Sequence, residues 1–233
     1  MQVDWVPVTR FEQNCSIHWC EATRRAAVVD PGGDLYRIQD FLEWEELTLE
    51  VVLVTHGHLD HAGGAAQLAA ETGARIEGPH RGDENLVRNL DRQGRMFNLK
   101  VQSYTPDRWL EHGDRIAVGE QFLDVVHCPG HTRGHVSYVD LASRFACVGD
   151  TLFLHSIGAW EHADGNLADL VNSIRDRLFP LGDDIRFLPG HGETSTFGHE
   201  RRMNPFVGDE ALLRYRAGEA PMARVSDAAL GGD

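Results

Sequence analysis

Basic side chains are scarce in this sequence. It has a single lysine, Lys100, and only 22 Lys and Arg residues against 36 Asp and Glu, so its net charge is −14. A protein that binds nucleic acid usually presents a basic face, and no cluster of Lys and Arg supplies one here. The arginine pairs at 24–25 and 201–202 are expected to lie on solvated surface. The composition therefore argues against a nucleic-acid partner and against a nuclease.

Long apolar runs and a disulfide framework are also missing. No segment approaches the length of a membrane span, and the first ten residues, "MQVDWVPVTR", have neither the basic nor the apolar region of a secretory signal. We therefore expect a cytoplasmic protein without a membrane partner. The four cysteines are too few for a disulfide framework in 233 residues, and Cys15 and Cys20 point to opposite faces of a strand-like stretch. We expect buried free thiols.

The chain is long enough to bury a sizeable core. We expect one hydrolase domain over 1–206, followed at 207–233 by a C-terminal surface helix and a flexible tail. Helices are predicted at 34–44, with Asp34 as N-cap, at 62–73, with Gly73 as the stop, at 83–90 and at 166–179. Strands are predicted at 3–8, 15–20, 26–29, 49–55, 74–77, 115–118, 121–127, 136–140, 145–148 and 184–192. This order predicts sheets covered by helices.

The stretch "THGHLDHAGG", residues 55–64, contains four candidate metal ligands within six positions: His56, His58, Asp60 and His61. Imidazole and carboxylate groups are the ligands that zinc and similar divalent metals prefer. In an extended segment His56 and His58 point the same way, because side chains alternate with a period of two. Asp60 and His61 fall where the chain turns toward a helix. The stretch therefore offers two ligand pairs that point in different directions.

Three further polar stretches follow predicted strands. They are "HCPGHTRGH" with His131, "VGDTLF" with Asp150, and "FLPGHGETS" with His191. Residues of binding sites are commonly carried on loops that a rigid scaffold positions. A single Asp or His in such a place is a weak signal, but four such stretches together predict a metal site.

With these motifs the sequence resembles the metallo-β-lactamase fold superfamily, and within it the short bacterial glyoxalase II (hydroxyacylglutathione hydrolase)-like proteins. The resemblance extends to "QNCSIHWCE", "VDPGGD", "HCPGHTRGHVSYVD" and "FLPGHGETSTFGHERRMNPF". It implies an α/β fold, a four-layer αββα sandwich of two mixed sheets flanked by helices. It also implies two divalent metal ions per chain, expected to be zinc, with iron or manganese compatible. The implied first site is His56, His58, His131 and Asp150, and the implied second site is Asp60, His61, Asp150 and His191.

The resemblance implies hydrolysis of a thioester such as S-D-lactoylglutathione by a hydroxide that bridges the two metals. Asp60 would accept a hydrogen bond from this nucleophile while it binds metal. Three alternatives remain open: a lactonase or other ester hydrolase, a persulfide dioxygenase with one iron on His56, His131 and Asp150, and a metal-binding module without catalysis. The presence of His191 favours two metals.

The sequence departs from the glyoxalase II pattern in "LHSIGAWEHADGN", residues 154–166. Ala159 and Glu161 stand where that group has the Arg and Asp of "GRxD", and Trp160, His155 and His162 add bulk and polarity near the expected mouth of the site. Arg133 replaces the usual Pro of "PGHTPGH". Trp160 and Arg133 are expected to contact the substrate.

Other polar residues of the motifs receive supporting roles. His135 is expected either to support a metal ligand or to be structural, and Asp30 is expected either to form the turn or to support a ligand. Cys128 is not expected to bind metal. Histidines outside the motifs, such as His18, are expected to be ordinary polar residues. Only 42 residues follow His191, so we expect no C-terminal helical domain of the kind with which typical glyoxalase II enzymes bind glutathione. The exact substrate and the oligomeric state stay open.

Overall fold

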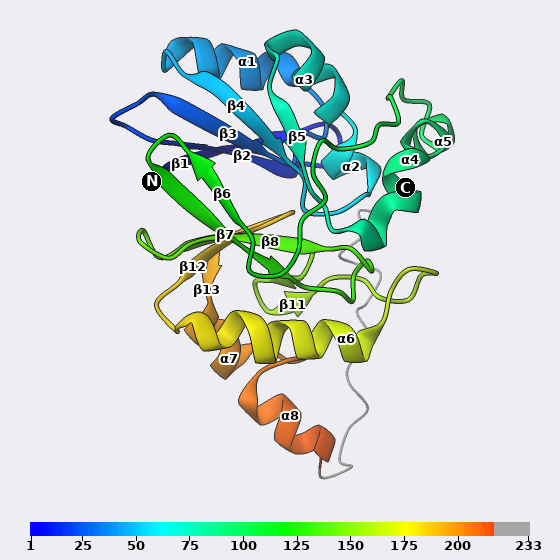
Figure 1. Cartoon of the computed structure of the whole chain (residues 1–233). Coiled ribbons are helices and arrows are strands. Elements are labelled where there is room, and N and C mark those ends of the chain that lie inside the picture. Colours follow the sequence, from blue (N-terminus) through cyan, green and yellow to red (C-terminus); the bar gives the residue numbers. More distant parts are fainter. Residues whose placement is uncertain (217–233) are drawn as a thin grey trace.

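Two β-sheets face each other in the computed structural model, which describes residues 1–216, and helices cover the outer face of each sheet (Figure 1). The first sheet has the order β1-β2-β3-β4-β5, with parallel pairing of β4 to both of its neighbours. Its strands are β1 (Gln2–Val8), β2 (Gln13–Trp19), β3 (Arg25–Val29), β4 (Thr48–Leu53) and β5 (Arg75–Glu77).

The second sheet has the order β13-β12-β9-β8-β7-β6, in which only β12 and β9 pair in parallel. Its strands are β6 (Arg115–Val118), β7 (Gln121–His127), β8 (Val136–Asp140), β9 (Phe145–Gly149), β12 (Arg186–Pro189) and β13 (Ser195–Thr196). Both sheets are mixed. A short hairpin of β10 (Leu152–Phe153) and β11 (Ser156–Ile157) lies beside them.

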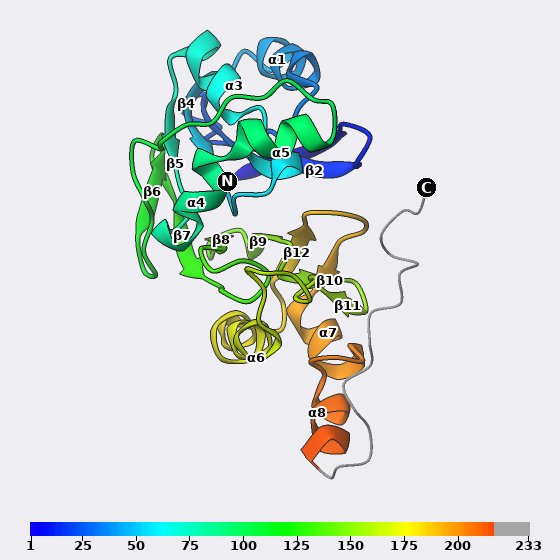
Figure 2. The ribbon, with the colours of Figure 1, turned by 90° about the vertical axis from the view of Figure 1, so that its right-hand side faces the viewer.

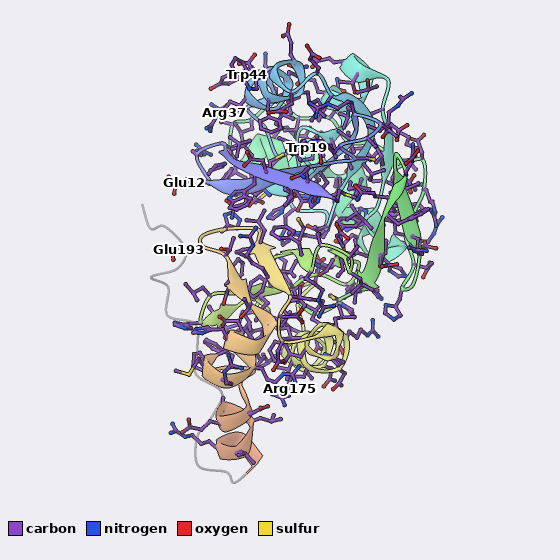
Figure 3. All side chains as sticks on the ribbon, turned by 90° about the vertical axis from the view of Figure 1, so that its left-hand side faces the viewer. Glu12, Trp19, Arg37, Trp44, Arg175 and Glu193 are labelled. Atoms are coloured by element: carbon purple, nitrogen blue, oxygen red, sulfur yellow. The ribbon has the colours of Figure 1, made fainter. Side chains whose placement is uncertain are left out.

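The helices form the two outer layers, seen edge-on in Figure 2. The first sheet is covered by α1 (Leu35–Trp44) and α3 (Ala65–Thr72), and the second by α6 (Leu167–Asn172), its continuation η2 (Ser173–Leu178) and η3 (Phe179–Leu181), and α7 (Phe197–Met203). Figure 3 accordingly places Trp44 and Arg175 at opposite outer layers. The predicted αββα sandwich of two mixed sheets is confirmed.

Shorter helices lie between these layers or beyond them. They are α2 (Leu59–Ala62), η1 (Arg81–Asp83), α4 (Glu84–Arg88), α5 (Leu90–Met96) and α8 (Asp209–Arg216). A helix thus lies within the predicted C-terminal segment 207–233, whereas the predicted tail, 217–233, lies outside the described residues. Within residues 1–216, no helix has the length and apolar character needed to cross a membrane.

The core between the sheets explains why the strands pair in this way. Apolar side chains of both sheets meet there, among them Val51 and Leu53 of β4, Val125 of β7 and Leu188 of β12. Tyr138 of β8 is fully buried and donates a hydrogen bond across the interface to the carbonyl oxygen of Val54, at 2.8 Å. Two further clusters fill the spaces between each sheet and its helices. Each sheet is therefore buried on both faces, as the apolar run at 49–55 indicates.

Several predicted helix boundaries need correction. Asp34 precedes α1 as predicted, but its side chain caps nothing on the helix; it accepts a hydrogen bond from the Thr9 backbone nitrogen at 2.7 Å. Gly73 ends α3 in the left-handed conformation, as predicted. The helix predicted at 62–73 is broken near Gly64, where a Cβ atom would overlap the Pro31 carbonyl oxygen. The helix predicted at 83–90 corresponds to α4, which ends at Arg88, and a second helix, α5, runs from Leu90 to Met96.

The cysteines are free and buried, as predicted, but His18 is not the ordinary polar residue that we expected. It lies buried between the sheets, and its Nε2 atom is 3.0 Å from Ser16 Oγ and 3.1 Å from Cys147 Sγ. Sequence alone does not show this, because Cys147 comes from the other sheet.

We expect His18 to make stability depend on pH. Burial lowers its pKa from 6.5 to about 4. The unfolded chain therefore binds this proton more tightly, and stability is lost as the pH falls through this range. Between pH 7 and pH 5 the free energy of unfolding should drop by about 2 kcal/mol more in the wild type than in His18→Leu. Urea unfolding of both metal-free proteins measures the difference, and the other histidines cancel in the comparison. Identical pH dependence would contradict this prediction.

Candidate metal centre

All seven predicted ligands come together at one edge of the sandwich, where the carboxyl ends of several strands meet. His56 and His58 follow β4, Asp60 and His61 lie on α2, and the others follow strands of the second sheet: His131 after β7, Asp150 after β9 and His191 after β12. The two sheets are also joined here. The Asn14 backbone nitrogen, in β2, donates to the Gly190 carbonyl oxygen at 2.7 Å. Figure 3 shows Glu12, before β2, and Glu193, after β12, along the same side of the molecule.

The first ligand group consists of His56, His58 and His131. His58 Nδ1 lies 3.1 Å from His56 Nε2 and 3.0 Å from His131 Nε2. Burial lowers the pKa of all three, that of His58 to about 3. The imidazoles are therefore neutral at pH 7, and neutral nitrogen is the form that binds a metal ion.

The second ligand group consists of Asp60, His61 and His191. His191 Nε2 is 3.1 Å and His61 Nε2 is 3.6 Å from Asp60 Oδ2. Asp150 lies between the two groups: its Oδ1 is 3.3 Å from His61 Nε2, and its Oδ2 is 3.6 Å from His131 Nε2. Asp150 is therefore the one carboxylate within reach of ligands from both groups.

Two buried atoms of this cluster show that a cation fits it. His61 Nε2 and Asp150 Oδ1 are buried and have no hydrogen-bond partner in the described part of the chain. An unpaired buried polar atom is costly, and each such atom calls for an explanation. Although burial opposes it, His61 holds the pKa of Asp150 well below its usual range, so this carboxylate is an anion. A divalent cation supplies the partner that both atoms lack.

The outward nitrogen of most of these imidazoles is held by a second hydrogen bond. His131 Nδ1 donates to the Ala159 carbonyl oxygen at 2.8 Å, and His191 Nδ1 donates to that of Phe11 at 3.0 Å. His61 Nδ1 lies 2.8 Å from Asp30 Oδ2. Such partners fix the tautomer and leave Nε2 free for metal.

The buried carboxylate of Asp30 contacts residues that orient histidines of both ligand groups. Besides His61, it accepts hydrogen bonds from the Thr55 backbone nitrogen at 2.7 Å and from the Thr55 hydroxyl at 2.6 Å. Thr55 Oγ1 in turn lies 3.0 Å from His56 Nδ1. One buried carboxylate thus orients a histidine of each ligand group, which is the second of the two roles predicted for it.

We expect Asp30→Asn to lower metal affinity by about 10–100-fold, because the amide cannot accept all three hydrogen bonds. Competition with a chromophoric chelator measures the affinity. Asp34→Asn, a carboxylate four residues along the same loop that is exposed, is the matched control. Equal affinities of Asp30→Asn and Asp34→Asn would contradict the orienting role.

The site leaves no room for a side chain at Gly190. A Cβ atom there would overlap Asp150 Oδ1 and lie 2.6 Å from His61 Cε1. The "PGHG" motif therefore needs this glycine for the close approach of the backbone to the ligands.

Two buried polar residues that are not metal ligands, His135 and Asp83, connect the loops that carry the ligands. His135, predicted to support a ligand or to be structural, accepts a hydrogen bond from the Asp150 backbone nitrogen at 3.1 Å. Asp83 belongs to none of the motifs recognised in the sequence. Its carboxylate is buried and accepts from the backbone nitrogens of Gly57, at 2.9 Å, and Gly134, at 2.6 Å, and from the Thr132 hydroxyl at 2.7 Å. It ties the His56–His58 loop to the His131 loop, and only the folded chain brings these segments together.

The remaining predicted site residues lie apart from the ligands. Trp160 is half-buried, and its ring packs edge-on against Phe206 with centroids 6.2 Å apart. Arg133 is exposed and lies 3.8 Å from Asp164, beside a depression of about 310 Å³ that none of the seven ligands lines. Their contact with substrate stays a prediction. Cys128 is buried against Ser137 and belongs to neither ligand group.

A third cluster of possible ligands, His155, His199 and Glu200, is already satisfied. The two Nε2 atoms are 2.7 Å apart, a normal hydrogen-bond distance. The Glu200 oxygens accept hydrogen bonds from Ser195, Asn204 and the His155 backbone nitrogen. This cluster therefore joins the β10–β11 hairpin to α7 and has no orphaned atom.

Comparison with known proteins agrees with this geometry. The sequence pattern of the metallo-beta-lactamase superfamily matches residues 8–191. The hydroxyacylglutathione hydrolase GloC of Haemophilus influenzae is 39% identical over 213 residues, which are 91% of this chain and 100% of that protein.

Two solved structures have the same fold. The BLEG-1 B3 metallo-beta-lactamase is 27% identical with a TM-score of 0.81, over 88% of this chain and 99% of that one. TTHA1623 in a di-iron-bound form is 29% identical with a TM-score of 0.79, over 87% and 99%. A protein of this fold thus carries two metal ions.

Proposed function

Because the chain belongs to the metallo-β-lactamase superfamily, we propose that it is a dinuclear metal-dependent thioesterase that hydrolyses S-D-lactoylglutathione or a similar hydroxyacyl thioester. The observation that carries this proposal is the pair of orphaned buried atoms, His61 Nε2 and Asp150 Oδ1, between two ligand groups. The choice of thioester rests on the relative from Haemophilus influenzae, whose name is hydroxyacylglutathione hydrolase.

In this proposal His56, His58, His131 and Asp150 would hold one metal ion, and Asp60, His61, His191 and Asp150 would hold the second. Two divalent ions bound there would lower the pKa of a water molecule and polarise a substrate carbonyl. The protein's own residues keep His56, His58 and His131 neutral through burial. Hydrogen bonds to Asp30, Ala159 and Phe11 orient His61, His131 and His191.

Asp60 has a further role in the proposal. Burial would raise its pKa, but His61 and His191 outweigh burial and hold the pKa below its usual range. The carboxylate therefore stays ionised and can only accept hydrogen bonds. It accepts one from the attacking water and so aims an oxygen lone pair at the thioester carbon, and no Ser or Cys nucleophile is required.

Metal analysis combined with substrate assays tests the proposal. The purified protein, loaded separately with zinc, iron or manganese, is assayed for thiol release from S-D-lactoylglutathione and for hydrolysis of a panel of lactones. We expect two metal ions per chain and thioester hydrolysis that a chelator abolishes. Hydrolysis of lactones alone would overturn the substrate. One iron per chain with oxygen consumption on glutathione persulfide would overturn the hydrolase assignment.

A further inference from the structure

The loop of residues 159–166, where the sequence departs from the glyoxalase II pattern, is anchored at both ends to the His131 loop. At its start the Ala159 carbonyl oxygen accepts the hydrogen bond from His131 Nδ1 at 2.8 Å. At its end the Asn166 backbone nitrogen donates to the Gly130 carbonyl oxygen at 2.7 Å. The packing of Trp160 on Phe206 adds a third anchor. The middle of the loop is therefore held in a fixed place beside the metal centre.

His162 occupies that middle position, and its ring faces the first ligand group. The centroid of its imidazole lies 5.3 Å from that of His131 and 5.5 Å from that of His58, both in edge-on orientation. The backbone of His162 is fixed by a turn in which the Gly165 nitrogen donates to its carbonyl oxygen at 3.0 Å. A side chain from a loop that carries none of the seven ligands thus stands next to two of them.

The Nε2 atom of His162 is buried and has no hydrogen-bond partner among the described residues. Leaving such an atom unpaired is costly, so a partner is expected when the site is in use. The nitrogen is not placed as a metal ligand: His162 is in none of the groups whose donor atoms lie within 4.8 Å of one another. Its partner is therefore a ligand that lies over the first ligand group.

We propose that His162 is the specificity-determining residue for the acyl group, and that its Nε2 forms a hydrogen bond with the 2-hydroxyl of a hydroxyacyl thioester. This inference rests on the proposed function, in which the thioester carbonyl faces the metals and the attacking water. The next polar atom along the acyl chain is the 2-hydroxyl. Imidazole nitrogen and hydroxyl are complementary in either tautomer, because each can donate or accept.

Two thioesters that differ by one oxygen atom test this inference. S-D-lactoylglutathione carries the 2-hydroxyl, and S-propionylglutathione lacks it. We expect His162→Phe to lower kcat/KM about tenfold for the lactoyl substrate and less than about twofold for the propionyl substrate, since one neutral hydrogen bond is lost. His162→Gln, which keeps a donor and an acceptor, should recover part of the loss. Glu161→Gln, the exposed neighbour, is the control.

Binding of the product acid gives a readout that does not depend on turnover. In calorimetric titrations of the zinc-loaded protein, D-lactate should bind about tenfold more tightly than propionate to the wild type, and the two should bind equally to His162→Phe. The zinc content of wild type and variant should be the same.

Equal losses for both thioesters, or a lower zinc content in His162→Phe, would mean that His162 supports the metal centre, and the inference would be overturned. If the proposed thioesterase function is wrong, the result is different, because the wild type would hydrolyse neither thioester. Tighter binding of D-lactate than of propionate, lost in His162→Phe, would in that case still support recognition of the hydroxyl by His162. Absence of that preference in the wild type would overturn the inference.

Discussion

Asp150→Ala is expected to reduce thioester hydrolysis by about 10³-fold or more and to lower the metal content of the purified protein below one ion per chain. Asp150 is the carboxylate that lies close to histidines of both groups, at 3.3 Å from His61 and 3.6 Å from His131. Its removal takes an anionic ligand from both sites at once. A 10³-fold loss corresponds to about 4 kcal/mol of transition-state stabilisation, which is within the range that metal-ion catalysis supplies.

The measurement is a steady-state assay at saturating metal together with elemental analysis after gel filtration. Asp176→Ala is the matched control, because Asp176 is an exposed carboxylate on η2, in the helix layer outside the second sheet. Retention of two ions and of full activity in Asp150→Ala would show that the centre does not depend on a shared carboxylate.

The strands of the second sheet illustrate how much of the fold can be predicted from the sequence. β6, β7 and β8 have the predicted boundaries, and β9 extends one residue further, to Gly149. Their alternating or continuously apolar patterns are local signals, and tight turns separate them. The β10–β11 hairpin, β13 and α7 were not predicted. Two-residue strands carry too little pattern, and α7 depends on contacts with η3 and β13 that form only in the folded chain.

In the candidate site, the metal ligands could be predicted from the sequence, but the contacts that support them could not. The seven ligands stand in short motifs after strands, so their residue types and spacing could be recognised. The contacts that support the ligands could not be recognised in this way. Asp83 joins loops that are 26 and 51 positions away along the chain, and no local sequence pattern indicates such a link. The sequence likewise showed His162 as an added polar residue, but not that its Nε2 is buried and unpaired beside His58 and His131. Such facts depend on three-dimensional packing.

His191→Ala is expected to remove one of the two metal ions and to lower kcat by about 100-fold, while the first ligand group keeps its ion. His191 lies 3.1 Å from Asp60 and 3.9 Å from Asp150, and it belongs to the second ligand group and not to the first. The loss of about 3 kcal/mol reflects the missing second ion at the shared water. His112→Ala, an exposed histidine in a turn, is the control.

This variant separates the two-metal hydrolase from chemistry that needs one metal. If the enzyme works with a single ion on His56, His131 and Asp150, His191→Ala should retain full activity and unchanged metal content. The metal content and kcat of the same preparation are therefore expected to fall together. A fall from two ions to one with full thioesterase activity would show that the second ion is dispensable. In His191→Ala, Asp60 would lose its hydrogen-bond partner His191 but would keep its contact with His61. Asp60 could therefore still orient the attacking water, although the pKa of that water would be lowered less than in the wild type. We expect about 1% of the activity to remain.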